Sequence, residues 1–308
     1  MRAFLFPGQG SQAVGMGVAL AEASRAAADV FAEVDEALGQ NLFRLMRDGP
    51  DDELKLTENA QPAIMAHSLA VLRTLDVELS GVANFVAGHS LGEYSALCAA
   101  GSFDLPTTAK LLKLRGQAMQ RAVPVGQGAM AALLGADLAL ARKIAAAAAQ
   151  GEICTVANDN DPTQVVISGH KGAIDRAIEL AKEMGAKRAL PLPVSAPFHC
   201  SLMQPAADAM SDALSYVVLE PPAVPLYANV TALPESDPDT IRNQLIEQVT
   251  GMVRWRESVA NMFDAGVHEF VELGGKVLGG MVKRIAPEAK VTSVVTIEDV
   301  EALAKEIA

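Results

Sequence analysis

A short segment flanked by glycines carries a serine that could act as a nucleophile. Residues 88–92 are Gly-His-Ser-Leu-Gly; they follow a predicted strand at 83–87 and precede a predicted helix at 93–100. A tight strand–helix turn needs glycine where side chains would collide, and it exposes the serine at the amino end of the helix. Free N–H groups and the helix dipole favour negative charge there. Ser90 is therefore predicted to attack a carbonyl carbon, and an ordinary strand–helix turn is the alternative.

A serine nucleophile needs a base, and His199 is favoured among the five histidines. His199 follows residues 193–198, where the chain is expected to return from an inserted subdomain to the main body. A side chain at such a junction can face a cleft between the two parts. Of the other four, His67 is expected on a helix face, and His89 beside Ser90 but turned away from it. His170 is expected in a surface turn, and His268 at the start of a strand.

Two further side chains suit the same chemistry. Gln9 lies between two glycines in a turn after the first predicted strand, where its amide could donate a hydrogen bond to an oxyanion. A plain glycine turn is the alternative for Gln9. Arg115 lies among apolar residues in a predicted helix, so it should need an anionic partner. That partner is either a carboxylate of the protein itself or an acidic substrate.

Composition excludes several classes of protein. Among 308 residues, 25 Lys and Arg against 37 Asp and Glu give a net charge of −12, which argues against nonspecific binding to nucleic acid or anionic membranes. Apolar residues make up 50%, so the chain can bury a sizeable core. No run approaches the roughly 18 apolar residues that a membrane-spanning helix needs. Cys98, Cys154 and Cys200 show neither disulfide-framework nor metal-ligand spacing, which favours a cytoplasmic location and predicts no metal or redox cofactor.

Strands and helices are expected to alternate along the chain. The expected helices are at 15–39, from Gln61-Pro62 to about 75, and at 107–123, 203–215, 241–249, 257–265 and 277–285; further strands are expected at 2–6, 225–230, 268–273 and 291–295. This alternation predicts a parallel sheet that is covered by helices on both faces.

The middle of the chain has a different pattern. Strands are expected at 129–134, 154–158, 164–168 and 186–190, with helices at 138–150 and 171–184. The resulting βαββαβ order is ferredoxin-like and complete in itself. We therefore expect residues 125–196 to form an inserted subdomain, and residues 1–124 and 197–308 to form the larger one.

Several motifs occur in an order and at spacings that resemble one family. They lie at residues 6–12, 61–63, 88–97, 115 and 197–199. Together they resemble the malonyl-CoA:acyl carrier protein transacylases of bacterial fatty-acid synthesis, from the first strand to about residue 285. The resemblance implies an α/β-hydrolase-like large subdomain with a parallel sheet and an inserted ferredoxin-like subdomain.

The resemblance also implies roles for individual residues. Ser90 would be the nucleophile and His199 the base, with Gln9 and the N–H of Leu91 forming the oxyanion hole. Arg115 would hold the free carboxylate of a malonyl group.

Three further positions follow from the same match. The backbone carbonyl of Gln248 would orient His199, and Gln61 and Phe198 would line the pocket. Leu91 after the serine and Phe198 before the histidine resemble the malonyl-specific pattern of the family.

The implied substrates are malonyl-CoA and acyl carrier protein, and the chain is expected to be a monomer. A carrier protein of this kind is expected to be acidic, so a local basic surface must overcome the net charge within a Debye length of roughly 10 Å. Six basic residues are candidates for that surface, and the alternative is that they are simply solvated charges: Lys182, Lys187, Arg188, Lys276, Lys283 and Arg284.

Two features depart from the family pattern. Cys200 replaces the usual serine after the histidine, and the loop at 272–278 is one residue shorter than is common. We expect these changes to affect local packing and loop geometry, and the chemistry to be retained.

Three other functions remain open from the sequence. An ordinary serine esterase would use a late histidine, which here is His268. A scaffold with a degenerate site could bind acyl carrier protein without catalysis. A free-standing acyltransferase could serve a polyketide synthase, since the partner carrier protein decides the pathway.

Overall fold

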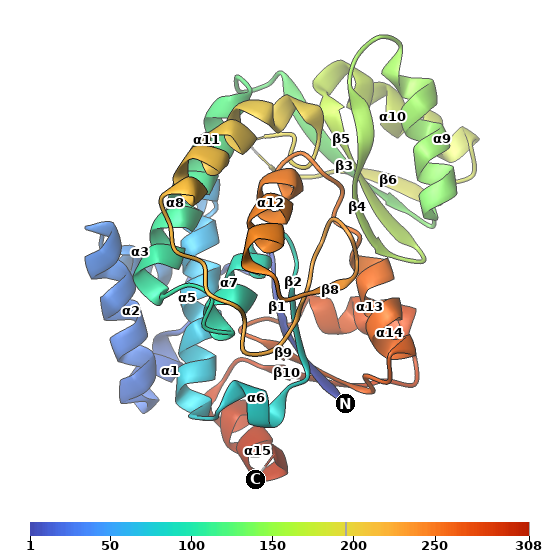
Figure 1. Cartoon of the computed structure of the whole chain (residues 1–308). Helices are drawn as coiled ribbons and strands as arrows, with labels where there is room; N and C mark the ends of the chain where they lie inside the picture. Colours follow the sequence, from blue (N-terminus) through green and yellow to red (C-terminus); the bar gives the residue numbers. More distant parts are fainter. Residues whose placement is uncertain (195, 308) are drawn as a thin grey trace.

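The larger of two sheets has six strands, in the order β10-β9-β1-β2-β7-β8 (Figure 1). A computed structural model describes residues 1–194 and 196–307. All neighbouring strands of this sheet are parallel except the pair β7 and β8. The strands are β1 (Arg2–Phe6), β2 (Phe85–Gly88), β7 (Leu226–Tyr227), β8 (Pro234–Glu235), β9 (Glu269–Leu273) and β10 (Lys290–Val294).

Helices cover both faces of this sheet. Alternate residues of β1 enter different cores: Phe4 and Phe6 pack with α2, α5, α7 and α8, whereas Ala3 and Leu5 pack with α13 and α14. Burial on both faces is typical of a parallel sheet, and it confirms the prediction. These helices are α2 (Arg25–Leu38), α5 (Thr57–Leu75), α7 (Gly92–Ala99), α8 (Leu105–Ala122), α13 (Trp255–Asp264) and α14 (Leu278–Ile285).

Two expected helices have different boundaries in the structure. The single helix expected at 15–39 is two helices, α1 (Val18–Ala23) and α2, because Ser24 is extended and its hydroxyl accepts a hydrogen bond from the N–H of Ala27. The helix expected to open at Gln61-Pro62 already begins at Thr57, so Pro62 lies inside α5. An internal proline costs about 3 kcal/mol, but α5 is buried along most of its length, and packing outweighs that local cost.

The second sheet is antiparallel, in the order β4-β5-β3-β6, with α9 and α10 on one face (Figure 1). The observed order of elements confirms the predicted βαββαβ arrangement, and the limits 124/125 and 196/197 stay a prediction. The other face contributes Met130, Ala132 and Val166 to the large core. The elements are β3 (Gly128–Leu134), α9 (Leu138–Ala149), β4 (Cys154–Asp161), β5 (Gln164–His170), α10 (Lys171–Glu183) and β6 (Arg188–Pro191).

Strand β4 joins the two sheets. Asn158 forms a parallel bridge with Val253, just before α13. Two buried aspartates of β4 then pair with arginines of α13 and α14, each at 2.8 Å: Asp159 with Arg256 and Asp161 with Arg284. Moving the small sheet away would separate each pair and leave a buried aspartate without its partner, which is costly. These contacts therefore stabilise the small sheet in its place beside the large one.

The remaining elements lie between or around the sheets. They are α3 (Leu42–Asp48), α4 (Asp51–Leu54), α6 (Leu79–Val82), a 3₁₀ turn at Ser201–Met203, α11 (Gln204–Ser215), α12 (Pro238–Gln248) and α15 (Ile297–Ile307). Within residues 1–194 and 196–307, every helix is too short or too polar to cross a membrane.

Candidate active site

Ser90 lies in a sharp turn between β2 and α7, with φ at 53°. A Cβ on Gly88 would come within 1.9 Å of the Gly92 carbonyl, and one on Gly92 within 2.2 Å of the Phe6 carbonyl oxygen. Because neither position tolerates a side chain, the predicted reason for the two glycines is confirmed. The turn places Ser90 at the carboxyl end of the central strands, where sites form in parallel sheets.

The structure brings Ser90 and His199 together. Oγ of Ser90 lies 2.8 Å from Nε2 of His199, and Nδ1 of His199 lies 2.9 Å from the backbone oxygen of Gln248. A carbonyl oxygen only accepts hydrogen bonds, which assigns the ring hydrogen to Nδ1 and leaves a lone pair on Nε2. The ring is therefore oriented to accept the Ser90 proton.

The environment of His199 predicts its behaviour with pH. Burial, together with the nearby positive charge of Arg115, lowers the pKa of His199 to about 3. Since protonation would add a charge to this buried site, the ring stays neutral, and able to act as a base, at every pH well above that value. A histidine with the usual pKa of about 6.5 would lose about tenfold in its neutral fraction between about pH 7.5 and 5.5.

We therefore expect kcat/KM for acylation of Ser90 to change by less than about twofold between about pH 7.5 and 5.5. Stopped-flow measurement of CoA release from malonyl-CoA would check this. A tenfold fall over the same range would mean that His199 titrates near its ordinary pKa.

Arg115 is buried beside Ser90, but its partners differ from the internal carboxylate that we considered. Its Nη2 donates to Oγ of Ser90 at 3.1 Å and to Oε1 of Gln248 at 2.8 Å, and its Nη1 donates to Oε1 of Gln61 at 2.9 Å. In the part of the chain that the structure describes, Nε has no partner. Among the described residues, the hydrogen bonds of Arg115 go only to neutral oxygens, so the expected internal ion pair is wrong. A buried cation without an anionic hydrogen-bond partner can receive an anion.

The predicted oxyanion donors lie at the same site. The N–H of Ser90 is already donated to Oδ1 of Asn229 at 2.8 Å, so it cannot serve. Among the described residues the N–H of Leu91 has no hydrogen-bond partner, and Gln9 lines the same cavity. Two candidate donors from different loops thus line the cavity that contains Ser90, and their role as an oxyanion hole stays a prediction.

A cavity of about 380 Å³ opens above Ser90 between the two sheets. Gln61 and Phe198 line it, as the resemblance implies. Met130 and Asn158 of the antiparallel sheet also line the cavity. The cavity therefore depends on both subdomains.

The alternative base, His268, lies far from this cavity. It precedes β9, and the parallel pairing of β1 and β9 begins with Arg2 opposite Glu269. His268 is thus at the amino ends of the strands, whereas Ser90 follows their carboxyl ends. The esterase arrangement with His268 as base is excluded by this geometry.

Both departures from the family pattern lie outside the cavity lining. Sγ of Cys200 is buried and donates to the carbonyl of Pro197 at 3.2 Å. In the shorter loop, Gly274 has φ at 81° and packs against Ser68. The sequence change at Cys200 is therefore absorbed by a backbone contact.

Sequence reasoning missed two buried residues that contact the site, Glu93 and Asn229. Glu93 lies one turn after Ser90, and its acidic side chain in an otherwise apolar helix start was a signal. Asn229 is 139 residues from Ser90 in the chain, and nothing in its local sequence indicated the contact.

The chain is similar to known proteins in both sequence and structure. Residues 3–278 match the family described as the acyl transferase domain. The chain is 46% identical over 284 residues to the malonyl CoA-acyl carrier protein transacylase of Escherichia coli strain K12, covering 92% of each protein. In structure it is similar to the acyl-carrier-protein-S-malonyltransferase of Bartonella henselae, with a TM-score of 0.97 and 51% identity over 99% of each chain.

A further similar structure is a malonyl-transacylase in complex with a type II PKS acyl-carrier protein, with a TM-score of 0.95 and 40% identity over 99% of each chain. The structural neighbours confirm the predicted two-subdomain α/β fold.

Proposed function

We propose that this chain, which belongs to the acyl transferase domain family, transfers the malonyl group of malonyl-CoA to the phosphopantetheine thiol of acyl carrier protein. This reaction would supply fatty-acid chain elongation. The observation that carries the proposal is Arg115, a buried guanidinium with Nη2 3.1 Å from Oγ of Ser90, whose hydrogen-bond partners among the described residues are all uncharged. A malonyl group on Ser90 has a free carboxylate to pair with it, whereas an acetyl group has none.

In the first half-reaction, Oγ of Ser90 attacks the thioester carbonyl while its proton moves to Nε2 of His199. The carbonyl π electrons move to oxygen, where the N–H of Leu91 and the amide of Gln9 stabilise the negative charge. Collapse of this intermediate breaks the C–S bond, and the sulfur of CoA takes the proton from His199. Malonyl-Ser90 remains.

The second half-reaction reverses these steps with a different thiol. His199 takes the proton of the carrier thiol, the sulfur attacks malonyl-Ser90, and Oγ of Ser90 recovers a proton from His199 as it leaves. This is ping-pong acyl transfer, and it uses only side chains and backbone N–H groups. We therefore propose that no metal or redox cofactor takes part.

Intact-mass spectrometry tests the covalent intermediate. After mixing with malonyl-CoA, the protein should gain about 86 Da, the mass of one malonyl group, and Ser90→Ala should gain nothing. Holo-acyl carrier protein should remove the added mass and become malonylated. Loss of the adduct to water without a carrier would indicate a hydrolase, and absence of any adduct would favour a scaffold.

A polyketide pathway is the second candidate, because one similar structure is a complex with a type II PKS acyl-carrier protein. The two pathways differ in the carrier, so the discharge of malonyl-Ser90 should be compared with carriers of both kinds. A preference of tenfold or more for the polyketide carrier would reassign the pathway and leave the chemistry unchanged.

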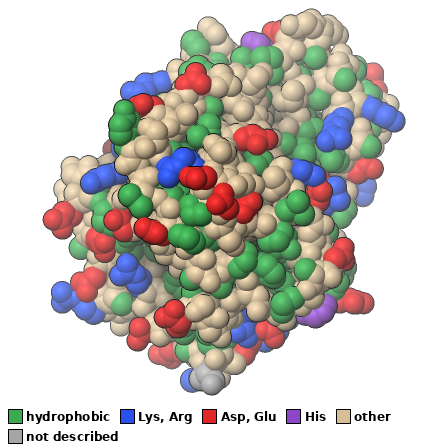
Figure 2. Space-filling model, viewed as in Figure 1, with side chains coloured by type: hydrophobic (Ala, Val, Ile, Leu, Met, Phe, Trp, Pro, Cys, Tyr) green, Lys and Arg blue, Asp and Glu red, His purple; other side chains and the backbone are tan. Residues whose placement is uncertain are grey.

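Part of the small subdomain could receive an acidic carrier. Lys182, Lys187 and Arg188 are exposed, and their side chains make no ion pair within the described residues, whereas Arg284 is paired with Asp161. Figure 2 shows basic side chains among acidic ones along the α9 and α10 edge of the molecule. The three exposed cations Lys182, Lys187 and Arg188 support a local basic surface on a chain whose net charge is −12.

Reversing this charge should weaken the second half-reaction alone. In Lys187→Glu/Arg188→Glu, we expect KM for the carrier to rise about tenfold at low salt, while acylation by malonyl-CoA is unchanged. Lys110→Glu/Arg121→Glu on α8 makes the same change in net charge elsewhere. Equal effects of the two double substitutions would show that net charge matters and the local surface does not.

The compartment is a further part of the proposal. Cys98, Cys154 and Cys200 are all free thiols, which supports a reducing, cytoplasmic environment. The monomeric state stays a prediction.

A further inference from the structure

Gln248, at the end of α12, contacts three groups of the proposed reaction. Its backbone oxygen faces Nδ1 of His199 at 2.9 Å, and its side-chain Oε1 accepts from Arg115 at 2.8 Å. Its Nε2 donates to the backbone oxygen of Ser90 at 3.0 Å. The orientation of this one amide therefore affects the nucleophile and the arginine together.

Glu93, together with Arg115 and the backbone oxygen of Ser90, fixes which way that amide points. Oε2 of Glu93 accepts a hydrogen bond from Nε2 of Gln248, and Glu93 is only 1% exposed. An acceptor on this side of Gln248 turns the nitrogen toward Glu93 and the oxygen toward Arg115. With the amide reversed, an N–H of Gln248 would face the N–H groups of Arg115.

The second carboxyl oxygen of Glu93 holds the turn that carries the nucleophile. Oε1 accepts from the backbone N–H of Asn229 at 2.9 Å. The Asn229 side chain accepts from the N–H of Ser90 at 2.8 Å and donates to the carbonyl of Gly88 at 2.7 Å. Asn229 thus bonds the two backbone groups that flank His89, directly before Ser90, whose φ is positive, and Glu93 holds the backbone of Asn229.

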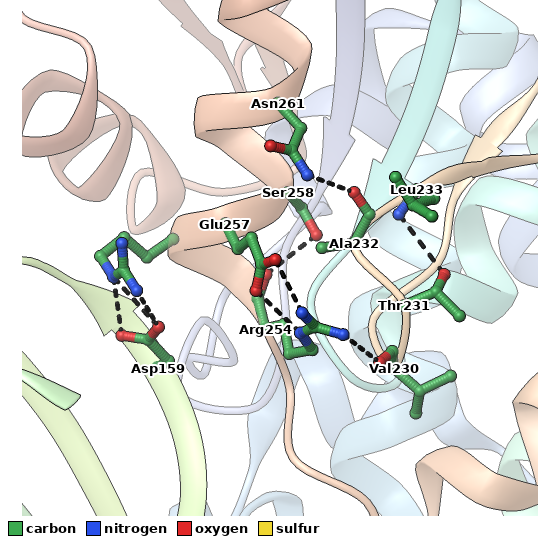
Figure 3. Close-up of polar contacts among 10 residues, drawn as sticks. Asp159, Val230, Thr231, Ala232, Leu233, Arg254, Glu257, Ser258 and Asn261 are labelled. Carbon is green, nitrogen blue, oxygen red and sulfur yellow. Dashed lines mark hydrogen bonds and ion pairs between the residues drawn. The ribbon is translucent and has the colours of Figure 1, made fainter. Parts of the chain in front are cut away.

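The residues that follow Asn229 in the same loop are held by contacts with α13 (Figure 3). Arg254 at the start of α13 donates through its side chain to the carbonyl of Val230 at 3.2 Å, and Asn261 donates to the carbonyl of Ala232 at 2.9 Å. The backbone N–H of Arg254 donates to the carbonyl of Asn229 itself at 2.9 Å. Glu93 therefore acts on a loop that has little freedom to move away from it.

Capping of α7 does not account for Glu93. An acidic residue in the first turn of a helix is favourable, but an exposed side chain would serve equally. The Glu93 carboxyl instead accepts from Asn229 and Gln248, both outside its own helix. Burial raises its pKa to about 8, against the two amide donors and the charge of Arg115, so this carboxyl is costly to keep in the interior.

We propose that Glu93 is a positioning residue that orients Gln248 and Asn229, and through them Arg115 and the Ser90 turn. This inference rests on the proposed acyl transfer from Ser90.

Glu93→Gln tests the inference with little change of shape. A carboxyl oxygen accepts a hydrogen bond whether or not the group is protonated, but an amide nitrogen does not accept. The glutamine of the variant has one oxygen in place of two, so it can accept from only one of the two donors, Gln248 and Asn229. The N–H group of the other donor must then face the amide N–H groups of the variant side chain. Because a displacement of about 1 Å can cost about 10² in rate, we expect single-turnover acylation at saturating malonyl-CoA to fall about 10- to 100-fold. Acylation by acetyl-CoA should also fall, since the Ser90 turn is affected.

Glu272→Gln is the matched control. Glu272 is fully buried, and its carboxyl accepts from the N–H groups of Val277, Leu278 and Gly279 at the start of α14, outside the network around Ser90. We expect this variant to have a lower Tm and an acylation rate within about twofold of wild type. A rate loss equal to that of Glu93→Gln would mean that general destabilisation explains both.

A double-mutant cycle with Gln248→Ala shows whether Glu93 acts through Gln248. In that background, Glu93→Gln should lower the rate by no more than about threefold, the remainder acting through Asn229. The same fold loss in both backgrounds would overturn the inference, as would a wild-type rate for Glu93→Gln. If Glu93→Gln does not fold, an unchanged acylation rate in Gln248→Ala also overturns it. Absence of acylation in the wild type would instead refute the proposed function.

Discussion

Replacing His199 with alanine is expected to slow acylation of Ser90 by malonyl-CoA about 10⁴-fold or more, because residues of a nucleophile–base pair act as a unit. Nε2 of His199 lies 2.8 Å from Oγ of Ser90, and no other histidine is hydrogen-bonded to that oxygen in the described chain. Without the ring, the Ser90 proton has no acceptor as the C–O bond forms. Quenched-flow mass spectrometry of malonyl-Ser90 would measure the rate.

His268→Ala is the control for His199→Ala, since His268 was the base of the esterase alternative. It lies at the amino ends of the strands and contacts the ring of Phe263, so its removal should leave the acylation rate within about twofold of wild type. A large loss in His268→Ala with little loss in His199→Ala would refute the assignment of the base.

The second large effect concerns the acyl group. Arg115→Ala is expected to lower kcat/KM for malonyl-CoA relative to acetyl-CoA by about 100-fold or more, since removing one partner of a buried charge pair costs about 2–5 kcal/mol. Both substrates should also lose some rate in common, because Arg115 donates to Oγ of Ser90 at 3.1 Å whichever acyl group is transferred. The ratio of the two substrates isolates the carboxylate contact from this shared effect.

Two further substitutions refine the test of Arg115. Arg115→Lys keeps the charge and loses the planar fork, so it should recover only part of the preference for malonyl-CoA. Arg121→Ala removes an exposed arginine from the same helix and should leave the preference unchanged. An equal loss for malonyl-CoA and acetyl-CoA in Arg115→Ala would remove Arg115 from carboxylate binding.

The sequence was sufficient to predict those features of the site and the fold that depend on residues near one another in the chain. The turn around Ser90 requires glycine at Gly88 and Gly92 because of contacts within a few residues or with the adjacent strand. The alternation of strands and helices, and the βαββαβ order of the middle segment, likewise follow from local periodicity and turn residues. These features predicted the two sheets and the end of the strand at which the site lies.

Local patterns failed at two places, at Pro62 because of distant contacts and at Ser24 because of a local cap. Pro62 should open a helix by its own preference, yet it lies within α5 because the surrounding core stabilises the turn before it. Ser24 divides a segment that alanine content predicted to be one helix, since its hydroxyl forms a cap at that point.

The partners of the buried polar groups were decided by the tertiary structure. Arg115 was expected to meet either a carboxylate of the protein or a substrate, and only packing showed that it meets Gln61, Gln248 and Ser90. The bond between Gln248 and Glu93 joins residues 155 positions apart. Such contacts depend on how α7, α8 and α12 pack together. The energy of a hydrogen bond depends on its partner and its burial more than on the residues beside it in the chain. The sequence by itself determined the turn and singled out Ser90 as the candidate nucleophile, whereas the fold decided what holds them in position.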